Sequence, residues 1–179
     1  MPRTYKMTIA GLERELPLCA IDNKVDIAAF IIFGDVELTV AASKALLERA
    51  PEFDVIVTPE AKSIPLAYEM ARQSGKTYVV ARKSTKLYMR NPISVDVKSI
   101  TTDRVQKLYL GSMECELLRG KRVLVVDDVI STGESLLAVE KLVAATNGSV
   151  VASCAILAEG DAAKRDDIIF LAPLPLFFK

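Results

Sequence analysis

The alternation of apolar and polar positions predicts a chain built from strands and helices in turn. The run Val123–Val126 is entirely apolar, which is typical of a strand buried on both of its faces. The acidic pair Asp127–Asp128 follows, at the position where this strand is expected to end. A polar turn over 131–135 then precedes a helix, which is predicted from apolar residues at helical spacing: Leu136, Val139, Leu142 and Val143.

A second unit of this kind lies earlier in the chain. Short apolar strands are predicted at Val55–Val57 and Tyr78–Ala81, and the helix between them has Pro65 near its start. Strand, helix and strand in this order imply parallel pairing with a right-handed crossover. Further strands are predicted over 149–157 and 167–171. The predicted fold class is therefore α/β, with a Rossmann-like parallel sheet flanked by helices.

Both ends of the chain predict additions to this sheet. Residues 5–20 alternate as a hairpin that turns at Gly11, and we expect them to form part of a small N-terminal hood over about residues 1–30. Asp35 is expected to cap the helix that follows. Two prolines exclude the tail 172–178 from a helix and from a central strand.

A further pair of strands is predicted between the two core units. Residues 94–100 and 105–110 are β-prone and flank a polar tip, which predicts a two-stranded β-arm over about 94–110. An ordinary surface hairpin and a flexible loop that closes over a reacting centre both fit this pattern.

Composition and charge narrow the possible functions. The 179 residues fit a single domain, 1–179, and 51% of them are apolar. Lys plus Arg equals Asp plus Glu at 23 each, so the chain lacks the positive excess of a nucleic-acid binder. No apolar run reaches the ~18 residues that cross a bilayer, and the start shows no signal-peptide pattern. We therefore expect neither a nucleic-acid nor a membrane partner.

The rarer residue types exclude further chemistry. Cys19, Cys115 and Cys154 have no Cys-x-x-Cys spacing, so we expect reduced thiols and a cytoplasmic protein. The chain has no histidine, which excludes a His-ligated metal site and a Ser-His-Asp triad. Any general acid or base must be another side chain or water.

The stretch 127–135 has the residue types that a sugar phosphate requires. Gly133 permits a positive φ or a close backbone approach, and N–H groups at the start of a helix favour an anion. Three hydroxyl side chains add donors: Ser131, Thr132 and Ser135. The acidic pair only accepts hydrogen bonds, which suits ribose hydroxyls or a hydrated magnesium ion. A buried strand followed by a polar turn and an acidic cap is the alternative interpretation.

Other phosphate-binding motifs are absent from this stretch. It lacks the Gly-Lys-Ser/Thr ending of a nucleoside-triphosphate P-loop and the Gly-x-Gly-x-x-Gly turn of dinucleotide-binding proteins. An unrelated small phosphatase or kinase is a further alternative, but the adjacent acids lack the Asp-x-Asp spacing of aspartyl-phosphate chemistry.

The complete string Val123–Ser135 resembles the phosphoribosyl pyrophosphate (PRPP) signature of the type I phosphoribosyltransferases. The adenine and xanthine enzymes of the purine branch are the most similar. The resemblance implies that Asp127 and Asp128 bind the ribose 2′- and 3′-hydroxyls and hold Mg²⁺ indirectly, through PRPP or water. It also implies a loop for the 5′-phosphate that consists of Ser131, Thr132, Gly133, Glu134 and Ser135.

Two further segments extend the resemblance to pyrophosphate. The run Glu60, Ala61, Lys62 and Ser63 stands where the adenine enzymes carry a Glu-Ala-Arg-Gly pyrophosphate loop. Arg82 and Lys83, with Lys86 after them, resemble a segment that reaches pyrophosphate, often across a dimer interface. The arm matches the family's flexible loop. The resemblance thus implies catalysis by Asp127, Asp128, Lys62 and Arg82, and base binding by Val129, Ile130 and Glu159.

The implied reaction transfers the phosphoribosyl group of PRPP to a purine base. It yields the nucleoside 5′-monophosphate and pyrophosphate, requires Mg²⁺ and is carried out by a cytoplasmic homodimer. A carboxylate at Glu159 accepts hydrogen bonds from an exocyclic amino group or a ring N–H, which favours adenine or guanine over xanthine, and adenine is placed first.

The chain departs from the family pattern at three positions. Tyr109 stands where the adenine enzymes place a Glu that faces the purine, and Ser131 stands where the hypoxanthine–guanine enzymes place a catalytic Asp. Glu134 replaces a common glycine of the phosphate loop. The missing acids favour an alternative function, a non-catalytic regulator of the same fold that senses PRPP or a purine nucleotide.

Overall fold

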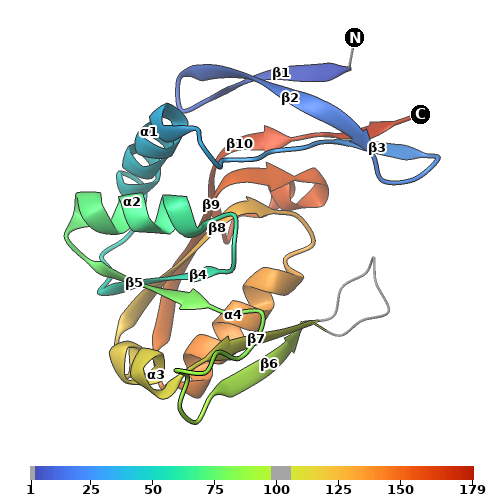
Figure 1. Cartoon of the computed structure of the whole chain (residues 1–179). Coiled ribbons are helices and arrows are strands. Elements are labelled where there is room, and N and C mark those ends of the chain that lie inside the picture. The colour runs from blue at the N-terminus through green and yellow to red at the C-terminus, as the bar shows by residue number, and fades with distance from the viewer. Residues whose placement is uncertain (1–2, 98–105) are drawn as a thin grey trace.

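The computed structural model describes residues 3–97 and 106–179 and is built around a five-stranded sheet (Figure 1). In spatial order its strands are β10 (Ile169–Leu174), β9 (Ser149–Glu159), β8 (Arg122–Ile130), β4 (Val55–Pro59) and β5 (Thr77–Ala81). Every neighbouring pair is parallel. The predicted α/β class is therefore confirmed, and the carboxyl ends of these strands lie at one edge of the sheet.

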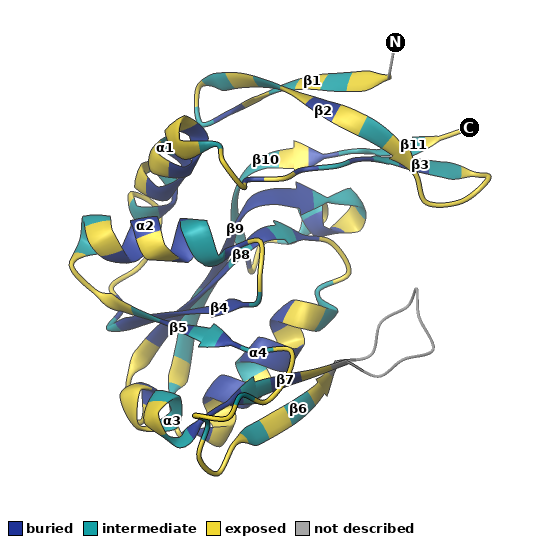
Figure 2. Cartoon of the chain, in the orientation of Figure 1, coloured by how far each residue is buried: buried dark blue, intermediate teal, exposed yellow. Residues whose placement is uncertain are grey.

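Helices cover both faces of this sheet. α1 (Val36–Leu47) and α2 (Ile64–Ser74) pack on one face, and α4 (Glu134–Ala145) packs on the other (Figure 1). Val126 belongs to the core beneath α1 and α2, whereas Val125 belongs to the core beneath α4. Figure 2 shows that the inner strands β4 and β8 are mostly buried between these layers, as their continuous apolar runs predict. Within the described ranges, none of the helices is long and apolar enough to cross a bilayer.

A second, antiparallel sheet forms the hood at the top of Figure 1. Its strands, in spatial order, are β1 (Thr4–Ile9), β2 (Leu12–Ala20), β3 (Val25–Ala28) and β11 (Leu176–Phe178). The predicted hairpin is confirmed as β1 and β2. The sequence does not predict β3 and β11, because both are short and they pair across almost the whole chain. The prolines of the tail are tolerated because β10 and β11 are edge strands.

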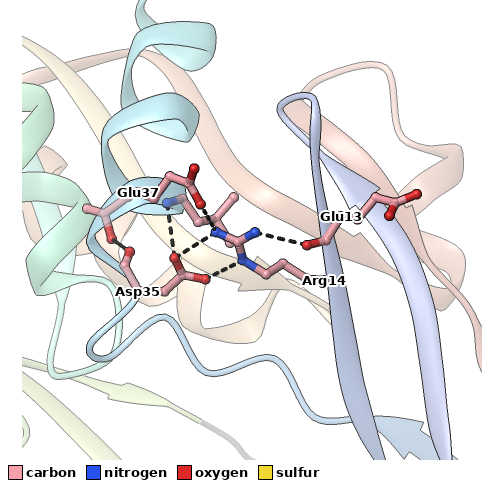
Figure 3. A network of polar contacts seen from close by, with 6 residues as sticks. Glu13, Arg14, Asp35 and Glu37 are labelled. Atoms are coloured by element: carbon pink, nitrogen blue, oxygen red, sulfur yellow. Dashed lines mark hydrogen bonds and ion pairs between the residues drawn. The ribbon is translucent and has the colours of Figure 1, made fainter.

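One polar network attaches the hood hairpin to the core (Figure 3). The Arg14 guanidinium donates two hydrogen bonds to Asp35, of 2.6 and 2.9 Å, and a third of 2.9 Å to Glu37. Asp35 also accepts a hydrogen bond of 3.1 Å from the backbone N–H of Leu38, so it is the predicted N-cap of α1. The Arg14 contact is the main cause that holds the pKa of Asp35 below its usual range. One carboxylate thus caps the helix and anchors the hairpin.

We expect Arg14→Met to loosen this attachment. A hydrogen bond to a charged group contributes about 2 kcal/mol to the free energy of unfolding. Losing this contribution should lower the melting temperature of a domain of this size by about 4–8 °C. Lys6→Met is the matched control, because its ion pair with Glu15 lies on the same hairpin but is exposed and contributes little. Equal shifts of the two variants in differential scanning fluorimetry would contradict the anchoring role.

The predicted arm is a two-stranded ribbon at its base. β6 (Ile93–Val97) pairs antiparallel with β7 (Gln106–Leu110), and the predicted tip lies outside the described residues. A short helix, α3 (Ser112–Leu118), follows the ribbon and is not predicted from the sequence. Closure of the arm over a site stays a prediction.

Candidate active site

The carboxyl ends of β4, β5 and β8 border a cavity of about 310 Å³. Because these strands are parallel neighbours, the loops that follow them share one edge of the sheet. The lining comes from the loops after β4 and β5, from β7 and β8, and from the start of α4: Pro59, Glu60, Ala61, Lys62, Ser63, Lys83, Leu108, Asp127, Asp128, Val129 and Ser135. All of these except Pro59 and Leu108 are residues that the sequence singles out.

An ion pair joins the pyrophosphate-loop segment to the acidic pair. Lys62 Nζ lies 2.9 Å from Asp128 Oδ2, and the side chains are 50% and 6% exposed. The ammonium group is not aligned as a hydrogen-bond donor, and Asp128 Oδ2 has no hydrogen-bond partner in the described part of the chain. The ion pair offsets the charge of this oxygen but leaves its lone pairs free for aligned hydrogen bonds. Asp128 therefore offers an acceptor to a ligand that carries hydroxyl groups.

The other acid, Asp127, lies inside the strand rather than after it. The expected strand end at the acidic pair is wrong, because β9 pairs with β8 beyond it, as far as Ile130. The backbone N–H of Asp128 donates a hydrogen bond of 2.8 Å to Asp127 Oδ1. Burial, and next the charge of Asp128, raise the pKa of Asp127 above its usual range. The surroundings of the acidic pair therefore disfavour the state in which both carboxyl groups are ionised.

Asp127→Asn is expected to stabilise the protein near neutral pH. Below about pH 4 the carboxyl is protonated in both the folded and the unfolded state. As the pH rises, the unfolded state loses this proton first, so the free energy of unfolding falls until the folded-state pKa is passed. We expect the variant to melt about 2–4 °C above the wild type near pH 8 and to match it near pH 4. Thermal denaturation at both pH values tests this, and a variant that is less stable at pH 8 would contradict the raised pKa.

Glu60 orients the basic residues at the end of β5. Its carboxylate accepts a hydrogen bond of 2.8 Å from the backbone N–H of Lys83, and its Oε1 lies 3.7 Å from Arg82 Nη2. The backbone of Arg82 exchanges hydrogen bonds of 2.9 and 2.8 Å with Tyr109, which attaches β7 to this strand end. The peptide bond between Glu60 and Ala61 is cis. The geometry thus gives Glu60 a role in placing cations at the cavity.

The hydroxyl group of Ser63 is used inside the protein. Ser63 is 1% exposed, its Oγ lies 2.7 Å from Thr58 Oγ1, and it donates a hydrogen bond of 3.0 Å to the carbonyl oxygen of Pro59. Thr58 Oγ1 also lies 2.8 Å from the carbonyl oxygen of Val126 in β8. These contacts fix the loop after β4 against β8. The Ser63 hydroxyl is thus used within the loop, and the predicted role of Ser63 in pyrophosphate binding stays a prediction.

The predicted phosphate loop turns the chain from β8 into α4. Gly133 has a φ of +81°, the left-handed conformation that glycine favours, and it caps the helix that begins at Glu134. Ser131, Thr132 and Ser135 are exposed. The backbone N–H of Glu134 lies 3.5 Å from Thr132 Oγ1. This arrangement leaves hydroxyl groups at the start of a helix, where an anion is favoured.

Eight predicted site residues do not line the cavity: Arg82, Lys86, Ile130, Ser131, Thr132, Gly133, Glu134 and Glu159. Lys86 Nζ lies 2.9 Å from Ser84 Oγ in the loop after β5. Ile130 is 3% exposed and packs in the core beneath α4, and its predicted role in base binding stays a prediction. Glu159 lies at the end of β9, where burial raises its pKa. Val129, in contrast, lines the cavity.

The chain is similar to known phosphoribosyltransferases. Residues 37–172 match the phosphoribosyl transferase domain, so the chain belongs to this family. It is 36% identical over 108 residues to the adenine phosphoribosyltransferase of Thermotoga petrophila, an alignment that covers 60% of each chain. It is 32% identical over 120 residues to the hypoxanthine/guanine phosphoribosyltransferase of Methanococcus voltae, which covers 67% of this chain and 60% of the relative. The chain thus spans about 60% of the length of these two relatives.

A solved structure confirms the fold. The crystal structure of adenine phosphoribosyltransferase from Thermoanaerobacter pseudethanolicus superimposes with a TM-score of 0.68 at 24% identity, over 79% of this chain and 84% of that one. The predicted membership of the type I phosphoribosyltransferases, in the purine branch, is confirmed by these similarities together.

Proposed function

We propose that this chain transfers the phosphoribosyl group of PRPP to a purine base, giving the nucleoside 5′-monophosphate and pyrophosphate. The observation that carries the proposal is the single cavity that brings together the acidic pair, Lys62 and Ser135, the last residue of the predicted phosphate loop. A sugar phosphate with a leaving pyrophosphate needs these three kinds of group next to one another.

The chemistry assigns a task to each part of the cavity. Breaking the C1–O bond of PRPP places positive charge on the sugar and negative charge on the departing pyrophosphate. Lys62, with Arg82 and Lys83, stabilises the negative charge as it develops. The acidic pair holds the ribose hydroxyls, so that the sugar stays fixed while the base attacks.

Magnesium fits the chemistry of this donor set. Mg²⁺ is usually held by one or two carboxylates together with substrate phosphates and water. Asp127 and Asp128 supply two carboxylates, and Asp128 Oδ2 is a buried oxygen without a hydrogen-bond partner among the described residues. Within residues 3–97 and 106–179, no three or more His, Cys, Asp or Glu side chains are grouped so that they could hold a metal ion by themselves. We therefore propose that the acidic pair holds Mg²⁺ through PRPP or water, and that the ion neutralises phosphate charge.

Adenine is the base that we place first. The relatives include enzymes named for adenine and for hypoxanthine and guanine. Glu159 favours adenine or guanine over xanthine, because its carboxylate accepts hydrogen bonds from an exocyclic amino group. Val129 and the apolar residues of β10 are proposed as contacts to the ring.

We also propose that the protein is a homodimer. The segment after Lys83 supports this, because Lys86 does not line the cavity of its own chain and Leu87 and Tyr88 are strongly exposed apolar residues beside it. Light scattering coupled to gel filtration tests the proposal. We expect the mass of a dimer. If the Leu87→Asp variant has the mass of a monomer, the dimer interface includes the segment around Leu87.

The activity is tested by incubating the protein with PRPP and Mg²⁺ and measuring pyrophosphate release. Adenine, hypoxanthine, guanine and xanthine are supplied one at a time, with a no-base reaction as the control for hydrolysis. We expect base-dependent release that is fastest with adenine, accompanied by the matching nucleoside monophosphate. Absence of release with every purine and pyrimidine base would refute the proposed activity.

A regulator that binds PRPP or a purine nucleotide without turnover is the second candidate. It is favoured by Tyr109, which stands where the adenine enzymes carry a carboxylate that faces the base. A regulator would bind a nucleic acid in a salt-dependent manner and show no pyrophosphate release. The equal numbers of acidic and basic residues make this the weaker candidate.

A further inference from the structure

A second loop lies against the phosphate loop, and it carries an arginine. β8 and β9 are parallel neighbours, so the segments that follow them emerge at the same edge of the sheet. The chain leaves β9 through a 3₁₀ helix, Gly160–Lys164, and then reaches Arg165. A Cβ atom placed on Gly133 would lie 2.7 Å from Arg165 Nη1. The guanidinium group therefore contacts the turn of the phosphate loop.

The guanidinium group is oriented by a carboxylate. Arg165 donates hydrogen bonds of 2.8 Å from Nε to Asp167 Oδ1 and of 2.7 Å from Nη2 to Asp167 Oδ2. This bidentate pairing uses one edge of the planar group and leaves Nη1 on the other side. Nη1 donates no hydrogen bond within the described part of the chain, and it is the atom that lies at Gly133. The free donor edge thus faces the loop.

The charges of the phosphate loop explain why a cation is useful there. None of residues 131–135 is basic, and Glu134 carries a negative charge. Asp167 offsets Arg165 only in part, because the Asp167 side chain is 63% exposed and its charge is screened by water, whereas that of Arg165 is 33% exposed. A guanidinium group also matches the geometry of a phosphate better than an ammonium group does.

We propose that Arg165 binds the 5′-phosphate of the pentose ligand through Nη1 and that Asp167 positions it. This inference rests on the proposed function, and it adds a phosphate-binding residue from outside the signature. Arg165 selects ligands that carry a 5′-phosphate over those that do not.

Calorimetric titration with the two halves of PRPP, ribose 5-phosphate and pyrophosphate, tests the inference. In Arg165→Gln we expect the Kd of ribose 5-phosphate to rise about 10- to 100-fold, since a hydrogen bond to a charged group is lost. The Kd of pyrophosphate is expected to change less than about twofold, because its site lies at Lys62 on another loop. Arg165→Lys should be intermediate, since it keeps the charge and loses the bidentate pairing.

One control variant and one further variant test whether the effect is specific to Arg165. Arg119→Gln removes an exposed arginine that is paired with Glu116 on α3, and it should leave both Kd values unchanged. Asp167→Asn keeps Arg165 but weakens its orientation, and a several-fold rise in the Kd of ribose 5-phosphate alone is expected. An unchanged Kd for ribose 5-phosphate in Arg165→Gln, or an equal loss for both ligands, would overturn the inference while leaving the proposed function intact. Failure of the wild type to bind ribose 5-phosphate would overturn both.

Discussion

Asp128→Asn is expected to lower kcat/KM for PRPP by about a hundred- to a thousandfold. The carboxylate is 6% exposed and pairs with Lys62 at 2.9 Å, so the substitution removes a buried charge and half of the acceptor capacity that faces the cavity. The fold should persist, because the amide has nearly the same shape. Steady-state kinetics at saturating base, with the melting temperature measured in parallel, gives the effect.

Asp54→Asn is the matched control for this prediction. Asp54 lies just before β4, at the opposite edge of the same sheet, and accepts a hydrogen bond of 2.9 Å from Arg122 Nη2. Loss of this pair should lower the melting temperature and leave kcat/KM within about twofold. If the two variants lost activity in proportion to stability, Asp128 would be a structural residue and not part of the site.

Lys62→Met is expected to lower kcat by about a hundred- to a thousandfold, because its ammonium group meets negative charge that grows only as pyrophosphate departs. The substitution leaves the buried Asp128 carboxylate without its cation, so the melting temperature should also fall, and kcat is compared at a temperature where both proteins are folded. Lys44→Met, an exposed lysine in the last turn of α1, is the control with unchanged kinetics. A higher KM for PRPP with an unchanged kcat would contradict this role, since it would mean equal binding of the ground and transition states.

Much of the fold follows from local signals in the sequence. Asp35 caps α1 as its side-chain chemistry predicts, and the continuous apolar runs identify β4 and β8 as buried strands. Pairing between distant segments is not visible in this way. The β3–β11 pair and the continuation of β8 through the acidic residues both depend on hydrogen bonds to strands elsewhere in the chain.

The candidate site was predictable only where one motif carried it. The acidic pair and the phosphate loop follow from their residue types and order, whereas Lys62 follows from the resemblance of its segment to a pyrophosphate loop. The directions of individual side chains could not be predicted from the sequence. Ile130 packs in the core, and the Ser63 hydroxyl group donates a hydrogen bond to the carbonyl oxygen of Pro59 within its own loop. Arg165 has no motif around it, and only the parallel packing of β8 and β9 brings it to Gly133.

The central claim is that the acidic pair binds the ribose and that the adjoining loop binds its 5′-phosphate. Calorimetric titration of the wild type and of Asp128→Asn with PRPP and Mg²⁺ tests it most directly. The account predicts one binding site per chain in the wild type and an affinity at least about tenfold weaker in the variant. Equal affinity in the two proteins, or no binding by the wild type, would contradict it.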